Sequence, residues 1–364
     1  MSEQTVDAAS RVTEASRPEV EPPLLEVDDL AVEFRTADGV IDAVDGLSYI
    51  VTAGRTLAIV GESGCGKSVS SLAVMGLLGP TARVTRGAVR FRGTDLLALP
   101  PKERRAVAGQ HVAMVFQDAL AALNPVHTVG YQLTEALRVR RGIGRREARR
   151  RAIDLLDMVR VPRAADRIRD YPHQFSGGMR QRVVIAAALA MDPQVFIADE
   201  PTTALDVTVQ AQILRLLAEI QAERRMGLVL ITHDLGVVAS VADDVTVMYA
   251  GHAVEQATVD EIFAAPAHPY TRALLRAMPR LALDAPVSDS VTGPVTDKRR
   301  GGRLDVIPGR PPRAGEIPVG CPFHPRCDAV LDVCRTTTPP LVVLHGGRSS
   351  RCHVATDVLE ASGG

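Results

Sequence analysis

A glycine-rich octapeptide, Gly61–Ser68, has the spacing of a loop that binds phosphate. Its sequence GESGCGKS matches the pattern G-x-x-x-x-G-K-[ST] in full, between an apolar run and a segment that favours a helix. Glycines let the backbone turn several N–H groups toward one point, which also faces the positive end of the helix dipole. We expect Lys67 to reach the β- and γ-phosphates of a nucleotide and Ser68 to ligate Mg²⁺.

Two adjacent carboxylates, Asp199 and Glu200, follow the apolar run Val195–Ala198. Buried carboxylates are costly unless they are used, although an apolar strand that ends in Asp-Glu is also common without any such role. Downstream of a phosphate-binding loop the pair favours a shared function. Asp199 would hold Mg²⁺ through water, and Glu200 would act as general base toward the attacking water.

The segments around these residues predict an α/β core. Short apolar runs bounded by turn residues indicate strands, and apolar residues at helical spacing between two of them complete a βαβ unit of a mostly parallel sheet. A helix is expected at Val69–Leu78, ended by Gly79-Pro80, and residues 132–160 should be mostly helical. The predicted strands are residues 24–27, 31–34, 56–60, 195–198 and 228–231.

Composition excludes several classes of protein. The chain has 364 residues, 46% of them hydrophobic, which suffices for a sizeable core. A net charge of −1, 3% aromatic residues and no Trp argue against nucleic-acid binding. The longest apolar run, Val183–Met191, is shorter than the roughly 20 residues of a membrane span. The N-terminus lacks the pattern of an export signal, and residues 1–22 have the composition of a disordered tail.

Between the two candidate phosphate-site segments lies Phe175–Arg182, FSGGMRQR, which resembles the signature of the ABC ATPase family. The order of phosphate loop, Gln117, signature, Asp-Glu strand and His233 is also the order of that family's motifs. The resemblance implies a P-loop NTPase of the ABC cassette type. It would have a mostly parallel sheet core, an antiparallel β subdomain and a helical subdomain at about 118–190. Phe175 departs from the usual Leu, but both are apolar.

The resemblance also implies roles for residues that would be uninformative alone. Ser176–Gly178, at a helix N-terminus, would contact the γ-phosphate bound by an opposite, head-to-tail subunit. Gln117 would sense Mg²⁺, water and the membrane partner, and His233 would contact the γ-phosphate. Asp206 belongs to the loop that joins the two sites, and Phe34 would stack on adenine, unless it is only a buried strand residue. The expected catalytic residues are Glu200, His233, Gln117 and Lys67, and the expected Mg²⁺ ligands are Ser68, Gln117 and Asp199. The residues expected to contact the nucleotide are Phe34, Gly61, Glu62, Ser63, Gly64, Cys65, Gly66, Lys67, Ser68, Val69, Gln117, Asp199, Ser176, Gly177, Gly178, Gln181 and Asp206.

Further segments resemble the ATPases of bacterial di- and oligopeptide importers. They are Val60–Gly64, Asn124-Pro125, Pro201–Gln210 and His268–Leu275, and the last resembles the start of that subfamily's C-terminal extension. Nickel and glutathione importers share much of this pattern, so they remain alternatives for the substrate. The implied division of the chain is an ATPase domain at 23–265 and an extension at 266–364, with a linker at 281–303 and cysteines within 321–352.

Four of the five cysteines gather in the extension. Their spacing, C-x5-C-x6-C-x17-C, lacks the paired C-x2-C knuckles of zinc ribbons, and four irregularly spaced thiolates can hold a [4Fe–4S] cluster. Some of the importer ATPases that the segment CPFHPRC resembles carry such a cluster. Iron–sulfur is therefore the first hypothesis, with zinc and free thiols as alternatives; the candidate ligands are Cys321, Cys327, Cys334 and Cys352.

The sequence thus predicts the ATP-hydrolysing subunit of an ABC importer for di- or oligopeptides. Such a subunit would lie peripherally on the cytoplasmic face of the cell membrane. Its partners would be two membrane-spanning permeases, a second related ATPase in a heterodimer, and, through the complex, an extracytoplasmic solute-binding protein. A soluble ABC ATPase acting on nucleic acid is the alternative from another class, but the long insertions of those proteins are absent between the loop and the signature.

Overall fold

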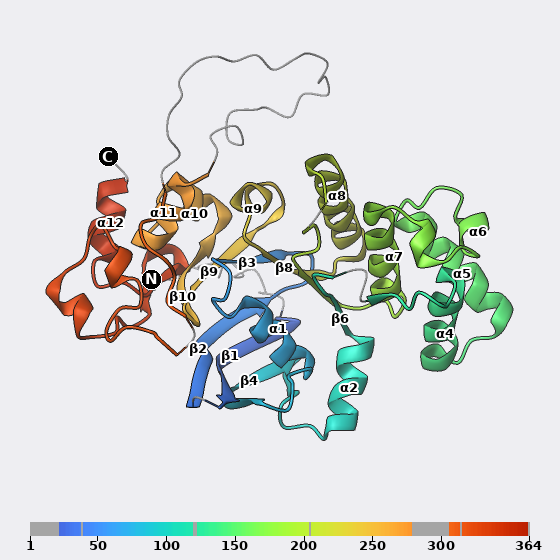
Figure 1. The fold of residues 1–364 in the computed structure, drawn as a ribbon, viewed down its shortest axis with the longest axis horizontal. Helices are drawn as coiled ribbons and strands as arrows, with labels where there is room; N and C mark the ends of the chain where they lie inside the picture. The colour runs from blue at the N-terminus through green and yellow to red at the C-terminus, as the bar shows by residue number, and fades with distance from the viewer. Residues whose placement is uncertain are drawn as a thin grey trace, which may run out of the picture.

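The computed structural model describes residues 22–37, 39–118, 122–203, 205–278, 306–313 and 315–362. The described strands form a four-stranded and an eight-stranded sheet (Figure 1). The linker predicted at 281–303 lies outside the described residues, as does the predicted tail apart from Pro22.

The eight-stranded sheet is the core of the molecule, and its strand order is β11-β12-β10-β9-β3-β8-β7-β6. Strands β9, β3, β8, β7 and β6 run parallel to one another, whereas β10, β12 and β11 continue the sheet in antiparallel fashion from β9. Every residue of β3, β7 and β8 is buried, as expected for central strands covered on both faces. The strands are β3 (Thr56–Val60), β6 (Val112–Val115), β7 (Val195–Asp199), β8 (Gly227–Thr232), β9 (Asp244–Tyr249), β10 (His252–Thr258), β11 (Val342–Val343) and β12 (Ser349–Ser350).

The four-stranded sheet is antiparallel, with the order β2-β1-β4-β5. The two strands predicted at residues 24–27 and 31–34 merge into the single strand β1, which begins at Leu25. The polar pair Asp28-Asp29 is absorbed as a bulge, where the register shifts and Asp29 has a φ of 47°. Its strands are β1 (Leu25–Thr36), β2 (Gly39–Val51), β4 (Ala82–Phe91) and β5 (Thr94–Asp95).

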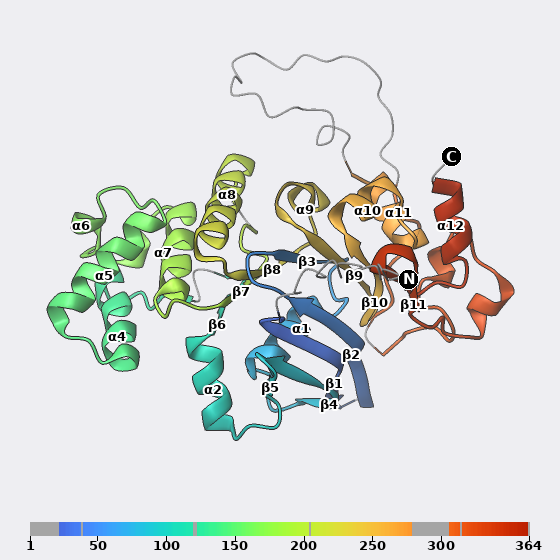
Figure 2. The ribbon, with the colours of Figure 1, turned by 180° about the vertical axis from the view of Figure 1, so that it is seen from behind.

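Helices flank the core sheet, and one group of them forms the end of the molecule beyond β6 (Figures 1 and 2). This helical group, α4 to α7, shares a hydrophobic core with α8 and with β6, β7 and β8. Helix α1 ends at Met75, before the predicted Leu78, because Gly76 adopts a left-handed φ of 67° and its N–H caps the last turn. The helices are α1 (Lys67–Met75), α2 (Pro101–Gln110), α4 (Val129–Arg141), α5 (Arg145–Met158), α6 (Ala164–Arg167), α7 (Gly177–Leu189), α8 (Val207–Arg224), α9 (Leu235–Val241), α10 (Val259–Ala264), α11 (Pro269–Arg276) and α12 (Ala355–Ser362).

The C-terminal segment, which comprises residues 266–278, 306–313 and 315–362, packs against the opposite end of the core sheet from the helical group (Figures 1 and 2). Tyr249 of β9, Tyr270 of α11 and Phe323 form an aromatic cluster with ring centroids 4.7 to 5.3 Å apart. Strand β12 pairs with β10, so this segment extends the sheet itself. In the described part of the chain, no helix combines the length and apolar character that a membrane span requires.

Candidate active site

Four parallel strands bring the predicted residues to one edge of the sheet. Strands β3, β8, β7 and β6 are neighbours, and their carboxyl ends therefore open on the same side. The phosphate loop follows β3, and Gln117 follows β6. Glu200 directly follows β7, and His233 directly follows β8. This is the edge at which open α/β sheets bind their ligands.

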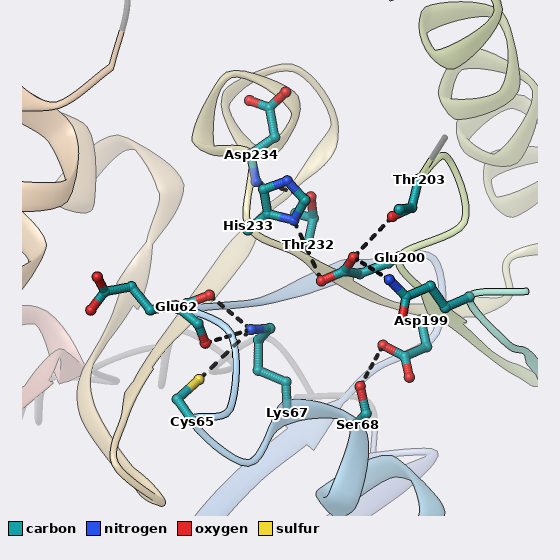
Figure 3. A network of polar contacts seen from close by, with 12 residues as sticks. Glu62, Cys65, Lys67, Ser68, Asp199, Glu200, Thr203, Thr232, His233 and Asp234 are labelled. Atoms are coloured by element: carbon teal, nitrogen blue, oxygen red, sulfur yellow. Dashed lines mark hydrogen bonds and ion pairs between the residues drawn. The ribbon is translucent and has the colours of Figure 1, made fainter. Parts of the chain in front are cut away.

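The phosphate loop is tightly packed and holds Lys67 within itself. The Lys67 ammonium donates to the carbonyl oxygens of Gly61 at 2.8 Å and Glu62 at 3.0 Å, and lies 3.7 Å from the Cys65 sulfur (Figure 3). A Cβ on Gly61 would lie 2.2 Å from the carbonyl oxygen of Met248, and Gly66 has a φ of 103°. Side chains are therefore excluded from these two glycines. Burial raises the pKa of the Cys65 thiol, although the nearby Lys67 ammonium opposes this rise.

Ser68 and Asp199 form a pair of oxygen ligands beside the loop. The Ser68 hydroxyl donates to a carboxylate oxygen of Asp199 at 3.0 Å. Burial raises the pKa of Asp199, as does the charge of Glu200, while the bond from Ser68 and the charge of Lys67 lower it. A hydroxyl and a carboxylate are donors that Mg²⁺ prefers, so the residues present fit that ion.

Three side chains contact the Glu200 carboxylate. The Gln117 amide donates to its carboxylate at 3.1 Å, the Thr203 hydroxyl donates at 2.9 Å, and Nδ1 of His233 lies 3.4 Å away (Figure 3). Its backbone has a φ of 45°, which a non-glycine residue adopts at a cost of about 1–3 kcal/mol. A strained backbone and three side-chain partners hold this carboxylate in one place, as a positioned general base requires.

Most of these residues line one pocket of about 760 Å³, although Gly61, Cys65, Asp199 and Thr203 are not among its described lining residues. Phe34 and Ile41, from the antiparallel sheet, line it together with Gln117, Glu200 and His233. The sequence reasoning missed Ile41, and it also missed three lining residues from the C-terminal segment. No local pattern marks them, because folding alone brings that segment to the pocket; they are Pro312, Arg313 and Ile317.

The signature residues lie elsewhere. Ser176 caps helix α7 by accepting from the Met179 N–H at 3.4 Å, and Asp206 caps α8 by accepting from the Val209 N–H at 3.0 Å. Neither these two caps nor Gly177, Gly178 and the buried Gln181 are among the described residues that line the pocket. Within one chain the structure therefore does not bring the signature to the phosphate loop.

The four C-terminal cysteines line one small cavity, together with apolar groups such as Phe323. Burial raises the pKa of Cys327 to about 11 and that of Cys352 to about 12. Across the described residues, no three His, Cys, Asp or Glu side chains stand close enough together to hold a metal ion. The four cysteines form no disulfide; they are Cys321, Cys327, Cys334 and Cys352. Thiolates are the donors that iron–sulfur and zinc sites use, so the thiols match such a group by donor type, although they share the cavity without forming a metal site in this structure.

Two family models match this chain. The model described as ABC transporter matches residues 44–203, which include the phosphate loop, the signature and Glu200. The model described as oligopeptide/dipeptide transporter, C-terminal region, matches residues 254–334, which include α11 and three of the cysteines.

Curated relatives match over almost their whole length. The dipeptide transport ATP-binding protein DppD of Escherichia coli (strain K12) is 49% identical over 334 residues, 92% of this chain and 97% of the relative. A putative peptide import ATP-binding protein of Brucella abortus (strain 2308) is 48% identical over 330 residues, 91% of this chain and 94% of the relative.

Solved structures of ABC cassettes share the fold. The dimeric structure of MJ0796, a bacterial ABC transporter cassette, aligns with a TM-score of 0.58 at 26% identity, over 65% of this chain and 98% of that one. The structure of cbiO1 from Clostridium perfringens, part of the ABC transporter complex cbiONQ, gives 0.58 at 29% identity, over 67% and 92%. The predicted cassette fold is confirmed, and the chain belongs to the ABC transporter family of ATP-binding proteins, with the C-terminal region of its oligopeptide/dipeptide transporters.

Proposed function

We propose that this chain is the ATP-hydrolysing subunit of an importer that takes up di- or oligopeptides. The observation that carries the ATPase part is the Glu200 carboxylate, which Gln117, Thr203 and His233 hold at the pocket that also contains the phosphate loop. The peptide part is supported by the dipeptide and peptide import relatives and by the matching C-terminal region.

Each pocket residue would have a distinct task in hydrolysis. The loop N–H groups would bind the phosphates, and Lys67 would exchange its carbonyl partners for the β- and γ-phosphates. Mg²⁺, held by Ser68, Asp199 and Gln117, would neutralise phosphate charge. Glu200 would take a proton from the attacking water, and His233 would stabilise charge at the γ-phosphate.

The signature would complete the site from a second subunit. Ser176, Gly177 and Gly178 stand at the N-terminus of α7, where N–H groups and the helix dipole favour a phosphate. Since they lie outside this chain's own pocket, we infer a head-to-tail pair in which each signature serves the other pocket. The second subunit would be a related but different ATPase, and Asp206 would lie in the loop between the two sites.

The proposed assembly also includes two membrane-spanning permeases and a solute-binding protein outside the membrane, with this chain peripheral on the cytoplasmic face. The test is uptake of a labelled tripeptide by liposomes that hold the reconstituted complex. Uptake should require ATP inside the liposomes and the binding protein outside. If the same liposomes take up nickel or glutathione but no peptide, the peptide assignment is wrong while the ATPase assignment stands.

We further propose that the cysteine cavity holds a [4Fe–4S] cluster, bound by Cys321, Cys327, Cys334 and Cys352. Protein purified without oxygen should then contain about four iron and four sulfide per chain and absorb visible light. The Cys327→Ser and Cys334→Ser variants should lose both. Because Cys65 lies in the phosphate loop, Cys65→Ser is the control and should keep the iron. A colourless protein with stoichiometric zinc would contradict the proposal.

A further inference from the structure

Glu62, the second residue of the phosphate loop, is held on both its backbone and its side chain by the C-terminal segment. Its N–H donates to the Tyr270 hydroxyl at 2.9 Å. Its carboxylate receives two bonds from the Arg326 guanidinium, at 2.6 and 3.0 Å. The carboxylate points away from the Lys67 ammonium (Figure 3), so its ion-pair partner lies outside the loop.

Arg326 is buried rather than exposed on the surface. Only 4% of its side chain is exposed, and the guanidinium lies 5.8 Å from the ring centroid of Tyr249 and 5.9 Å from that of Phe323. A bidentate arginine–carboxylate pair with stacked aromatic neighbours fixes both partners more tightly than a surface ion pair does. The Glu62 side chain is 25% exposed, so its partner is the more deeply buried member of the pair.

The same guanidinium also holds the segment that borders the nucleotide pocket. Its Nε donates to the carbonyl oxygen of Pro308 at 2.9 Å. A few residues further on, Pro312, Arg313 and Ile317 line the pocket. One buried side chain therefore connects the phosphate loop to the wall of the pocket that the C-terminal segment provides.

We propose that Arg326 is a positioning residue of the ATP site, which sets the geometry of the phosphate loop through Glu62. The inference rests on the proposed ATPase function of this pocket. Its route is short, because the Glu62 carbonyl accepts a bond from Lys67 at 3.0 Å. To reach a phosphate, the Lys67 ammonium must leave this carbonyl. Fixing Glu62 therefore fixes the backbone position from which Lys67 starts. The C-terminal segment would thus prepare the loop for ATP, and bound ATP would in turn stabilise the segment.

The test is ATP binding to the full chain, measured by calorimetry with the Arg326→Met variant. The dissociation constant for MgATP should rise about tenfold, within the range usual for coupled sites. Arg326→Lys should recover part of the loss, since an ammonium keeps the charge but not the two parallel bonds. Glu62→Gln should weaken binding from the other side of the pair, and the Glu62→Gln/Arg326→Met double variant should be no weaker than the worse single variant.

A matched control separates positioning from general stability. Arg272, on α11 of the same segment, pairs with Asp328 at 2.9 Å, and among the described residues no hydrogen bond or ion pair joins it to the loop. Arg272→Met should leave the dissociation constant unchanged. In hydrogen exchange, ATP should protect the amides of α11 and of residues 320–327 in the wild-type chain and in Arg272→Met, but much less in Arg326→Met.

Two results would overturn the inference. One is wild-type ATP affinity in both Arg326→Met and Glu62→Gln, and the other is an equal loss in Arg326→Met and Arg272→Met. The Lys67→Ala variant keeps these results distinct from a failure of the proposed function. If the wild-type chain binds ATP and Lys67→Ala does not, the ATP site stands and only the role of Arg326 is refuted.

Discussion

The Glu200→Gln variant should hydrolyse ATP about 10²- to 10⁴-fold more slowly than the wild-type chain, the usual contribution of a general base. Glutamine keeps the shape of the side chain and an acceptor oxygen for Thr203, but it cannot take a proton from water. ATP should therefore remain bound and uncleaved, and the head-to-tail pair should persist. Phosphate release by the reconstituted complex measures the rate, and size-exclusion chromatography with ATP measures the pairing.

The control for this variant is Glu147→Gln. Glu147 lies on α5 in the helical group, where it pairs with Arg150 and Arg151 on the surface. Exposed pairs of this kind contribute little, so turnover should match the wild-type chain. Undiminished hydrolysis in Glu200→Gln would remove Glu200 from the role of general base.

The Arg348→Met variant should lower the free energy of unfolding by about 3–5 kcal/mol, the cost of leaving a buried charge without its partner. Glu255 on β10 is fully buried, and Arg348 donates to its carboxylate at 2.9 Å. The N–H groups of Ala267 and His268 donate to the same carboxylate. These two bonds would remain, but no cation would balance the charge. Urea denaturation followed by circular dichroism measures the loss.

The deficit of Arg348→Met should depend on pH in a defined direction. Burial already raises the pKa of Glu255 above its ordinary 4.5, against the bonds from its donors and the charge of Arg348. Removing Arg348 raises this pKa further. A raised folded-state pKa favours folding at low pH, and this contribution is lost as the pH rises through that pKa. The difference from the wild-type chain should therefore be largest near neutrality and shrink as the pH falls toward 4.5.

An exposed arginine provides the comparison for Arg348. Arg55 pairs with Asp244 at 2.9 Å, with side chains 47% and 41% exposed. Arg55→Met should cost less than about 1 kcal/mol at any pH in this range. Equal losses in the two variants would show that burial of the Glu255 charge does not determine the effect.

The sequence predicted the chemistry of the pocket because that chemistry depends on local order. The pattern of Gly61–Ser68 needs only a preceding strand and a following helix, and both are present. Asp199 and Glu200 end an apolar run that is central in the sheet, as its composition indicates. The predicted boundaries were wrong where one backbone angle decides them. Gly76 ends α1 before the predicted Leu78, and the left-handed Asp29 makes a bulge where the prediction placed a break between two strands.

Contacts between distant segments could not be predicted. Arg326 and Glu62 are 264 positions apart, and nothing in either neighbourhood indicates the other. Ile317 lines the nucleotide pocket from a segment in which the Pro308 carbonyl accepts a hydrogen bond from Arg326. The strand β12 has two residues, too few for a periodic pattern, and its pairing with β10 is set by the surrounding packing.

That short strand covers part of a longer one, since it pairs with Glu255 and Gln256 of β10. Without β12 and β11, the seven-residue strand β10 would present its unpaired backbone groups to solvent, where another chain could add to it. At this end of the sheet the outermost strand is β11, which has only two residues and offers few backbone groups for another chain to pair with. A shortened chain that stops at residue 334, where the matched C-terminal region ends, would lack this cover and should aggregate more readily than the full chain.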